Sequence, residues 1–240
     1  MWTVASEMRS GKLHTKSNQY ERRTTLKYMT KRIEFHTHTI LSDGVLLPSE
    51  LIRRAYVADH EAIAITDHVD FSNVESVIRS TKRAAEGFSG IEVLVGAEIT
   101  HVVPEKIPKL VHKAKGLGAQ LILVHGETIV EPVAPGTNQA AAALADVNII
   151  AHPGFISPED AELARQNGIY LELTARCGHN VTNGHVAKIA TKVLVNTDCH
   201  GTELIGSADA ARIAQGAGLT EEEAQRATTQ NAKLLLNEIL

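Results

Sequence analysis

The feature that most constrains the fold is a regular alternation, from Ile33 onward, of short apolar runs with longer amphipathic segments. The apolar runs are rich in Ile, Val and Leu, as buried strands are, and lie at residues 33–37, 62–66, 92–97, 120–124, 147–151, 169–173 and 193–196. The amphipathic segments have the spacing of helices and lie at residues 48–58, 74–86, 104–117, 138–144, 158–166 and 185–191.

This alternation predicts an α/β protein with parallel strands that are covered by helices. A closed or nearly closed TIM-like barrel is the most economical arrangement of seven such units, and 240 residues suffice for one barrel domain. An open doubly wound sheet is the alternative. Residues 208–240 predict further helices, one of which has Thr220 as its N-terminal cap.

Residues 1–30 differ from the rest of the chain, because they are polar, rich in Lys and Arg, and without clear periodicity. We expect a poorly ordered N-terminal extension, followed by a single barrel domain over residues 31–240. A short helix packed on the bottom of the barrel is the alternative for the extension. Met29 precedes the first strand and is an alternative start of the natural protein.

The cysteine content and the hydropathy predict the compartment. Cys177 and Cys199 are too few for a disulfide framework, which favours a reducing cytoplasm. No apolar run approaches the ~20 residues of a membrane span, and residues 1–30 lack the apolar centre of a signal peptide. We therefore expect a cytoplasmic protein that does not enter a membrane.

Histidine is unusually frequent, with 12 in the chain, and most of these residues lie beside acidic residues at the ends of the apolar runs. The carboxyl ends of parallel strands meet at one mouth of a barrel, so these side chains are expected to converge. Six of these histidines and three acidic residues are candidate metal ligands: His36, His38, Asp43, His68, Glu98, His125, His152, Asp198 and His200. In contrast, His14, His60 and His112 lie away from strand ends and are expected to be surface or packing residues.

Imidazole and carboxylate groups are ligands that Zn²⁺, Mn²⁺ and Fe²⁺ share. Residues i and i+2 of a strand point the same way, so His36 and His38 are expected to share an ion, as are Asp198 and His200. A single histidine at a strand end is usually only a hydrogen-bonded residue; its repetition at successive strand ends favours metal binding. The candidates exceed the needs of one ion and predict two or three divalent ions with a bridging carboxylate.

Several short motifs, taken together, resemble those of one family. In chain order they are His36-Thr37-His38 with Ser42-Asp43-Gly44, Pro48-Ser49-Glu50, Thr66-Asp67-His68, Gly96-Ala97-Glu98, Ala151-His152-Pro153-Gly154 and Asn196-Thr197-Asp198-Cys199-His200. The chain resembles the PHP family, named for polymerase and histidinol phosphatase domains, and within it the stand-alone, histidinol-phosphatase-like members. The resemblance covers residues 33–240 and implies a distorted seven-stranded β/α barrel with up to three metal ions.

The resemblance also implies which residues hold each ion. The first ion falls to His36, His38, Glu98 and Asp198. Glu98 bridges to a second ion that is held by His125 and His152, and the third ion falls to Asp43, His68 and His200. The flank of His125 is the least diagnostic of the nine, and Glu127 is an alternative ligand or a partner that orients a ligand histidine.

Other residues near the expected mouth are candidates for supporting roles. Arg176 is expected to clamp a phosphate, with a salt bridge to a carboxylate as the alternative. His179 or His185 is expected to protonate a leaving group, although His185 is more readily explained as a structural residue at a helix start. The loop at residues 132–138 is expected to form part of the rim.

Two further residues adjoin candidate ligands. Asp67 precedes His68 and is expected to orient His36 or His38 through a hydrogen bond. Cys199 lies between two ligands and, at strand period, points away from them, so we expect a buried structural thiol.

These observations favour a metal-dependent phosphoric ester hydrolase, most simply a phosphomonoesterase that acts on a small metabolite. A phosphodiesterase or exonuclease is the first alternative; a net charge of −4 and an aromatic content of 4% are unusual for a single-strand groove but do not exclude a nucleotide. A catalytically inactive metal-binding barrel and an amidohydrolase-like enzyme are further alternatives. The substrate, the metal and the oligomeric state stay open.

Overall fold

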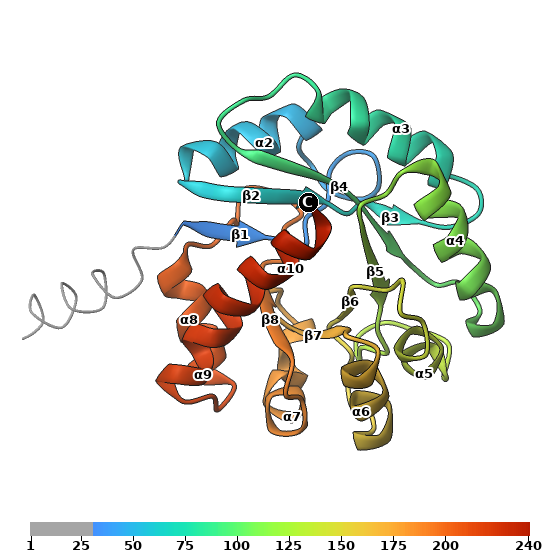
Figure 1. The fold of residues 1–240 in the computed structure, drawn as a ribbon, viewed down its shortest axis with the longest axis vertical. Helices are drawn as coiled ribbons and strands as arrows, with labels where there is room; N and C mark the ends of the chain where they lie inside the picture. The colour runs from blue at the N-terminus through green and yellow to red at the C-terminus, as the bar shows by residue number, and fades with distance from the viewer. Residues whose placement is uncertain (1–30) are drawn as a thin grey trace, which may run out of the picture. The chain divides into compact units, whose positions relative to one another are not determined.

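The computed structural model describes residues 31–240, which form an α/β barrel (Figure 1). Its parallel strands are β1 (Arg32–Glu34), β2 (His60–Ile65), β3 (His68–Val69), β4 (Glu92–Ile99), β5 (Leu121–His125), β6 (Ile149–Ala151), β7 (Tyr170–Thr174) and β8 (Val193–Asn196). The sheet order is β1-β2-β4-β5-β6-β7-β8, and the short β3 pairs with β4. This arrangement confirms the predicted TIM-like barrel.

The ring is closed between its first and last strands just beyond their carboxyl ends. Thr37 and Cys199 form a parallel bridge there, and the backbone N–H of His38 donates to the carbonyl of Cys199 at 2.7 Å. The closure places the segments after β1 and β8 side by side, and both carry candidate ligands. The open doubly wound sheet is therefore not the fold.

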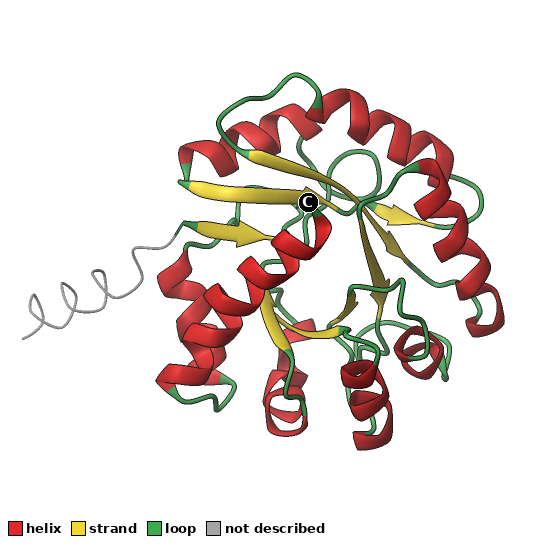
Figure 2. Cartoon of the chain, viewed as in Figure 1, coloured by secondary structure: helices red, strands yellow, loops and turns green. Residues whose placement is uncertain are grey.

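Helices surround the strands (Figure 2). They are α2 (Pro48–Val57), α3 (Val74–Ala85), α4 (Ile107–Leu117), α5 (Thr137–Ala142), α6 (Pro158–Gln166), α7 (Asn183–Ile189), α8 (Ser207–Gly216), α9 (Glu221–Gln225) and α10 (Asn231–Ile239). Single-turn helices at Pro104–Lys106 and His179–Thr182 precede α4 and α7, and a π-helical turn at Arg226–Gln230 joins α9 to α10. Thr220 and Glu223 form a capping box at the start of α9, as the predicted cap at Thr220 requires.

Apolar side chains fill the interior of the barrel. Inside the barrel, inward-facing strand residues such as Ile33 and Tyr170 pack with Leu235 and Leu236 of α10. This helix crosses the amino-terminal end of the strands (Figure 1), where the Asn231 side chain donates to the carbonyl of Val193 at 2.8 Å. One end of the barrel is thus covered, and the opposite end is left for the site.

The structure departs from the predicted elements in a few places. β3 was not predicted, since two residues are too short for a periodic signal, and β4 extends to Ile99, so that Glu98 lies within the strand. The helix expected to open at His185 begins two residues earlier, at Asn183. The expectations for residues 1–30 lie outside the described residues.

Candidate metal centre

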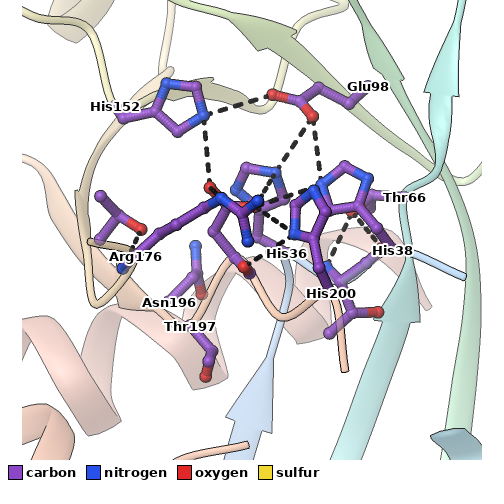
Figure 3. Close-up of polar contacts among 12 residues, drawn as sticks. His36, His38, Thr66, Glu98, His152, Arg176, Asn196, Thr197 and His200 are labelled. Atoms are coloured by element: carbon purple, nitrogen blue, oxygen red, sulfur yellow. Dashed lines mark hydrogen bonds and ion pairs between the residues drawn. The ribbon is translucent and has the colours of Figure 1, made fainter. Parts of the chain in front are cut away.

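The nine candidate ligands converge at the carboxyl-terminal mouth of the barrel. His36 and His38 follow β1, Glu98 lies one residue before the end of β4, and His125 ends β5. The others come from β3 or from the loops after β1, β6 and β8. In Figure 3, dashed lines run from Glu98 to His152 on one side and to His36 and His38 on the other. The structure thus brings together side chains from six strand ends, as the sequence predicted.

The centre of the cluster is two buried histidines with two buried carboxylates. Oε2 of Glu98 lies 3.2 Å from Nε2 of His36 and 3.3 Å from Nε2 of His38. Oδ1 of Asp198 lies 3.3 Å from Nε2 of His38 and 3.6 Å from Nε2 of His36. These separations are short enough for the four side chains to reach a common ion.

Within residues 31–240, several of these polar atoms make no hydrogen bond although they lie close together. Both oxygens of Glu98, Oδ1 of Asp198 and Nε2 of His36 are buried without a hydrogen-bond partner among the described residues, despite their close neighbours. Buried polar atoms are rarely left in this state, because each costs about 1–3 kcal/mol. Ions bound among them would give each of these atoms a partner, so the residues fit divalent cations.

A second group combines His68 of β3 with residues of the segments that follow β1 and β8. Asp43 has one oxygen 3.2 Å from Nε2 of His200 and the other 3.5 Å from Nε2 of His68. Ligand atoms of His38, Asp43, His68 and His200 all lie within 4.8 Å of one another. Burial would raise the pKa of Asp43, but the hydrogen bond with His200 and the charge of His68 outweigh it and lower that pKa to about 2. The carboxylate is therefore ionised and able to bind a cation.

A third group contains three buried histidines, His125, His152 and His179, whose ligand atoms lie within 4.8 Å of one another. Nε2 of His152 lies 3.7 Å from Glu98 and 3.6 Å from Asp198, which connects this group to the centre. His179, predicted as an acid for the leaving group, therefore lies among candidate ligands.

Burial and neighbouring charges shift the pKa values of these groups in opposite directions. Burial would lower the pKa of His36, but the charges of Glu172 and Glu98 outweigh it and raise that pKa well above its ordinary value. Burial, reinforced by neighbouring imidazoles, lowers the pKa of His152 well below its ordinary value. Burial also raises the pKa of Asp198 to about 6. A cation that binds here would therefore have to displace protons from some of these groups.

Glu172, in the middle of β7, contacts two of the candidate ligands, His36 and His152. Its Oε1 lies 2.8 Å from Nδ1 of His36 and accepts from the Asn196 amide at 2.9 Å, and its Oε2 accepts from the backbone N–H of His152 at 3.0 Å. Glu172 was not among the nine predicted ligands, although it lies near the end of a predicted strand. A lone carboxylate within an apolar strand run is a signal that could have identified it, because an ionised group is seldom buried without partners.

Asp67 does not orient His36 or His38, so that expectation is wrong. Its carboxylate accepts from the backbone N–H and hydroxyl of Thr39 and from the hydroxyl of Ser42, each at 2.7 Å. Asp67 therefore fixes the loop that leads from His38 to Asp43.

Glu127 does not join the groups of candidate ligand atoms among the described residues. Its Oε1 accepts from the backbone N–H groups of Gly136 and Asn138, at 3.1 and 2.9 Å, and so holds the start of α5. The predicted alternative acid, His185, lies 2.8 Å from the carbonyl oxygen of Ile156 through Nε2, which favours the structural explanation. Both side chains are occupied by bonds to the backbone, which sequence patterns do not reveal.

Sequence reasoning also missed Glu131 and His101. Oε2 of Glu131 lies 3.2 Å from Nε2 of His125 and 3.3 Å from Nε2 of His101, and its Oε1 lies 3.2 Å from Nε2 of His179. The hydrogen bond with His125 is the main cause that lowers the pKa of Glu131 to about 2. Both residues lie in loops, and loop conformation has no periodic sequence signal.

Arg176 and Cys199 complete the surroundings. Nε of Arg176 lies 3.8 Å from Oδ2 of Asp198, and the two line a cavity of about 500 Å³ together with Ala175, Cys177, Thr197, Glu203 and Ile205. Cys199 is fully buried, as predicted, and burial raises the pKa of its thiol to about 12.

The backbone is strained at two candidate ligands. His152 and Asp198 have φ values of +27° and +54°, in or near the left-handed region that side chains other than glycine rarely adopt. Such conformations cost on the order of 1–3 kcal/mol and concentrate at functional sites. Next to His152, a Cβ on Gly154 would lie 1.9 Å from the carbonyl oxygen of Glu127, so the motif requires glycine.

Comparison with known proteins agrees with this geometry. Residues 34–236 match the PHP domain family. An uncharacterised protein of Methanocaldococcus jannaschii, MJ1295, is 50% identical over 217 residues, which cover 87% of this chain and 100% of that protein. A 5'-3' exoribonuclease of Haemophilus influenzae is 29% identical over 133 residues, which cover 49% of this chain and 47% of that protein. The solved A. niger ochratoxinase shares the fold alone, with a TM-score of 0.55 and 12% identity over 85% of this chain and 71% of its own.

The barrel and its converging imidazoles and carboxylates define the class of protein, a metal-dependent hydrolase. Within that class, the chain belongs to the PHP domain family, whose match spans almost all of the described residues. The predicted family is thereby confirmed. No helix in residues 31–240 is long and apolar enough to cross a membrane.

Proposed function

We propose that the protein is a phosphomonoesterase that hydrolyses a small phosphorylated metabolite with two or three divalent ions, Zn²⁺, Mn²⁺ or Fe²⁺, at the barrel mouth. The observation that carries the proposal is the set of candidate ligand groups around Glu98, with Asp198 close to His36 and His38 and Arg176 beside Asp198. His36, His38, Glu98 and Asp198 would hold the central ion, and the other two groups would hold its neighbours.

Bound divalent ions supply hydroxide near neutral pH and neutralise phosphate oxygens. The protein residues supply the rest of the chemistry. Arg176, one-third exposed beside Asp198, would donate a pair of hydrogen bonds to the phosphate. Asp67 and Glu172 hold the ligand loops and rings in place, which keeps the reacting groups oriented.

The cavity beside Arg176 supports a small leaving group. Its volume of about 500 Å³ is that of a metabolite-sized site, and its lining combines Arg176 and Glu203 with the apolar Ile205. The free thiols of Cys177 and Cys199 support the proposed cytoplasmic location.

A nuclease is the second candidate, because the Haemophilus influenzae relative is a 5'-3' exoribonuclease. That match covers about half of either chain. The net charge of −4 weighs against a long nucleic acid substrate, which leaves a short nucleotide as the form this alternative would take.

The test is phosphate release from a panel of small phosphomonoesters, including histidinol phosphate, by metal-reconstituted protein. We expect release that EDTA abolishes and that is lost when His36→Ala is combined with Asp198→Ala. Release from nucleotide diesters alone would favour the nuclease. No release from either panel by a metal-loaded sample would overturn the proposal.

A further inference from the structure

The loop between β5 and α5 brings a carboxylate to the third group of histidines. Glu131 lies in this loop, and its two oxygens contact Nε2 of His125 and Nε2 of His179 at 3.2 Å each. Those two histidines share with His152 a set of ligand atoms within 4.8 Å of one another. Three imidazoles and one carboxylate therefore meet at one side of the mouth.

The loop that carries Glu131 is fixed by contacts of Glu127 and Val130, which precede it. Before Glu131, the backbone N–H of Glu127 donates to the Asn138 side chain at 3.1 Å, and the Glu127 carboxylate accepts from the start of α5. Val130 lies against Gly178, where an added Cβ would come within 3.5 Å of it. The position of Glu131 beside the histidines is therefore set by contacts of its neighbours in the loop.

His101 fixes the carboxylate from the outer side. Its Nε2 lies 3.3 Å from Oε2 of Glu131, the same oxygen that faces His125. A ligand carboxylate that also contacts a further donor is typical of metal sites, where such partners orient the ligand. His101 itself has a φ of +52°, in the left-handed region that is uncommon outside glycine.

We propose that Glu131 and His179 are ligands of the ion at His125 and His152, and that His101 positions Glu131. The set of three imidazoles and one carboxylate matches the ligands that Zn²⁺ accepts in proteins. Glu131 is one-third exposed, so it closes the solvent side of a position whose other ligands are buried. The proposal rests on the metal centre of the proposed function and makes His179 a ligand in place of an acid.

The test measures the ions that each chain retains during dialysis against increasing concentrations of a chelator. Wild-type protein is compared with Glu131→Gln and with Glu222→Gln, a matched control on α9 that is 87% exposed. We expect Glu131→Gln to lose one ion at a chelator concentration about 10–100-fold lower, and Glu222→Gln to behave as wild type. His101→Gln is expected to shift the same ion by a smaller factor, and the visible spectrum of bound Co²⁺ should change in Glu131→Gln.

Retention of every ion by Glu131→Gln at the wild-type chelator concentration would overturn the proposal, as would wild-type protein that binds no ion. If Glu131→Gln fails to fold by circular dichroism, His179→Asn carries the same expectation. A wild-type protein that hydrolyses no phosphate ester, while Glu131→Gln still loses one ion, would contradict the proposed function and leave this inference standing. If wild-type protein hydrolyses a phosphate ester and Glu131→Gln loses no ion, the proposed function stands and this inference is contradicted.

Discussion

At the scale of single residues, Glu172 shows how a buried charge supports a metal site. It contacts the ring of His36 and the backbone of His152, so one carboxylate orients ligands from two strand ends. We expect Glu172→Gln to weaken metal binding about 10–100-fold, because loss of the charge removes the orienting partner of His36. Isothermal titration with Zn²⁺ against the Glu222→Gln control measures the effect; equal affinities would show that Glu172 has only a packing role.

The two thiols are expected to differ in reactivity. Cys177 is exposed, whereas Cys199 is buried and the pKa of its thiol is raised to about 12. Because the thiolate is the reactive form, Cys199 should stay unmodified below that pH in the folded protein. A colorimetric thiol reagent at pH 8 should count one thiol per chain, and two after denaturation. Two equally fast native thiols would contradict the burial of Cys199.

Metal binding is expected to weaken as the pH falls. The pKa of His36 is raised well above its ordinary value in the folded, metal-free protein, so its surroundings favour the protonated imidazole. A cation must displace that proton, so binding should release protons, and affinity should fall from pH 8 to pH 6. Titration calorimetry in two buffers of different ionisation enthalpy measures the release. A binding heat that is the same in both buffers would show that metal binding releases no protons.

At the scale of elements, α10 is expected to stabilise the barrel without taking part in the site. Leu235 is 1% exposed within the barrel core, whereas Leu234 beside it is 55% exposed. Leu235→Ala should lower the free energy of unfolding by about 2–5 kcal/mol, because it leaves a cavity. Leu234→Ala is the matched control and should have little effect in urea denaturation. Equal losses from both variants would mean that α10 does not fill the end of the barrel.

The regular elements were predictable because each has a periodic pattern of apolar residues. Residues 193–196 and 158–166 have the predicted bounds, and the ligands at strand ends follow once the strands are known to be parallel. Glu131 and His101 were not predictable, because their positions depend on how loops cross the mouth. Asp67 was assigned a wrong partner for the same reason, since its bonds to Thr39 and Ser42 depend on the path of a loop.

At the scale of the whole molecule, the metal centre is expected to join the strand ends into one cooperative unit. The candidate ligands come from β3, β4, β5 and the segments after β1, β6 and β8, so bound ions would connect most of the barrel. A cation at about 100 times its dissociation constant adds about 2.7 kcal/mol of stability per site. Removal of metal should therefore lower the Tm in scanning calorimetry. Identical Tm values with and without metal would show that the ions bind without linking these elements.

The central claim is that hydrolysis of a phosphate ester depends on ions bound at this mouth. The most direct test is the rate of phosphate release from the best phosphomonoester, measured as metal is added back to stripped protein in known equivalents. We predict no release from the stripped protein and a rate that rises until more than one ion is bound per chain. Full activity in the stripped protein, or none in protein with ions verifiably bound, would contradict the claim.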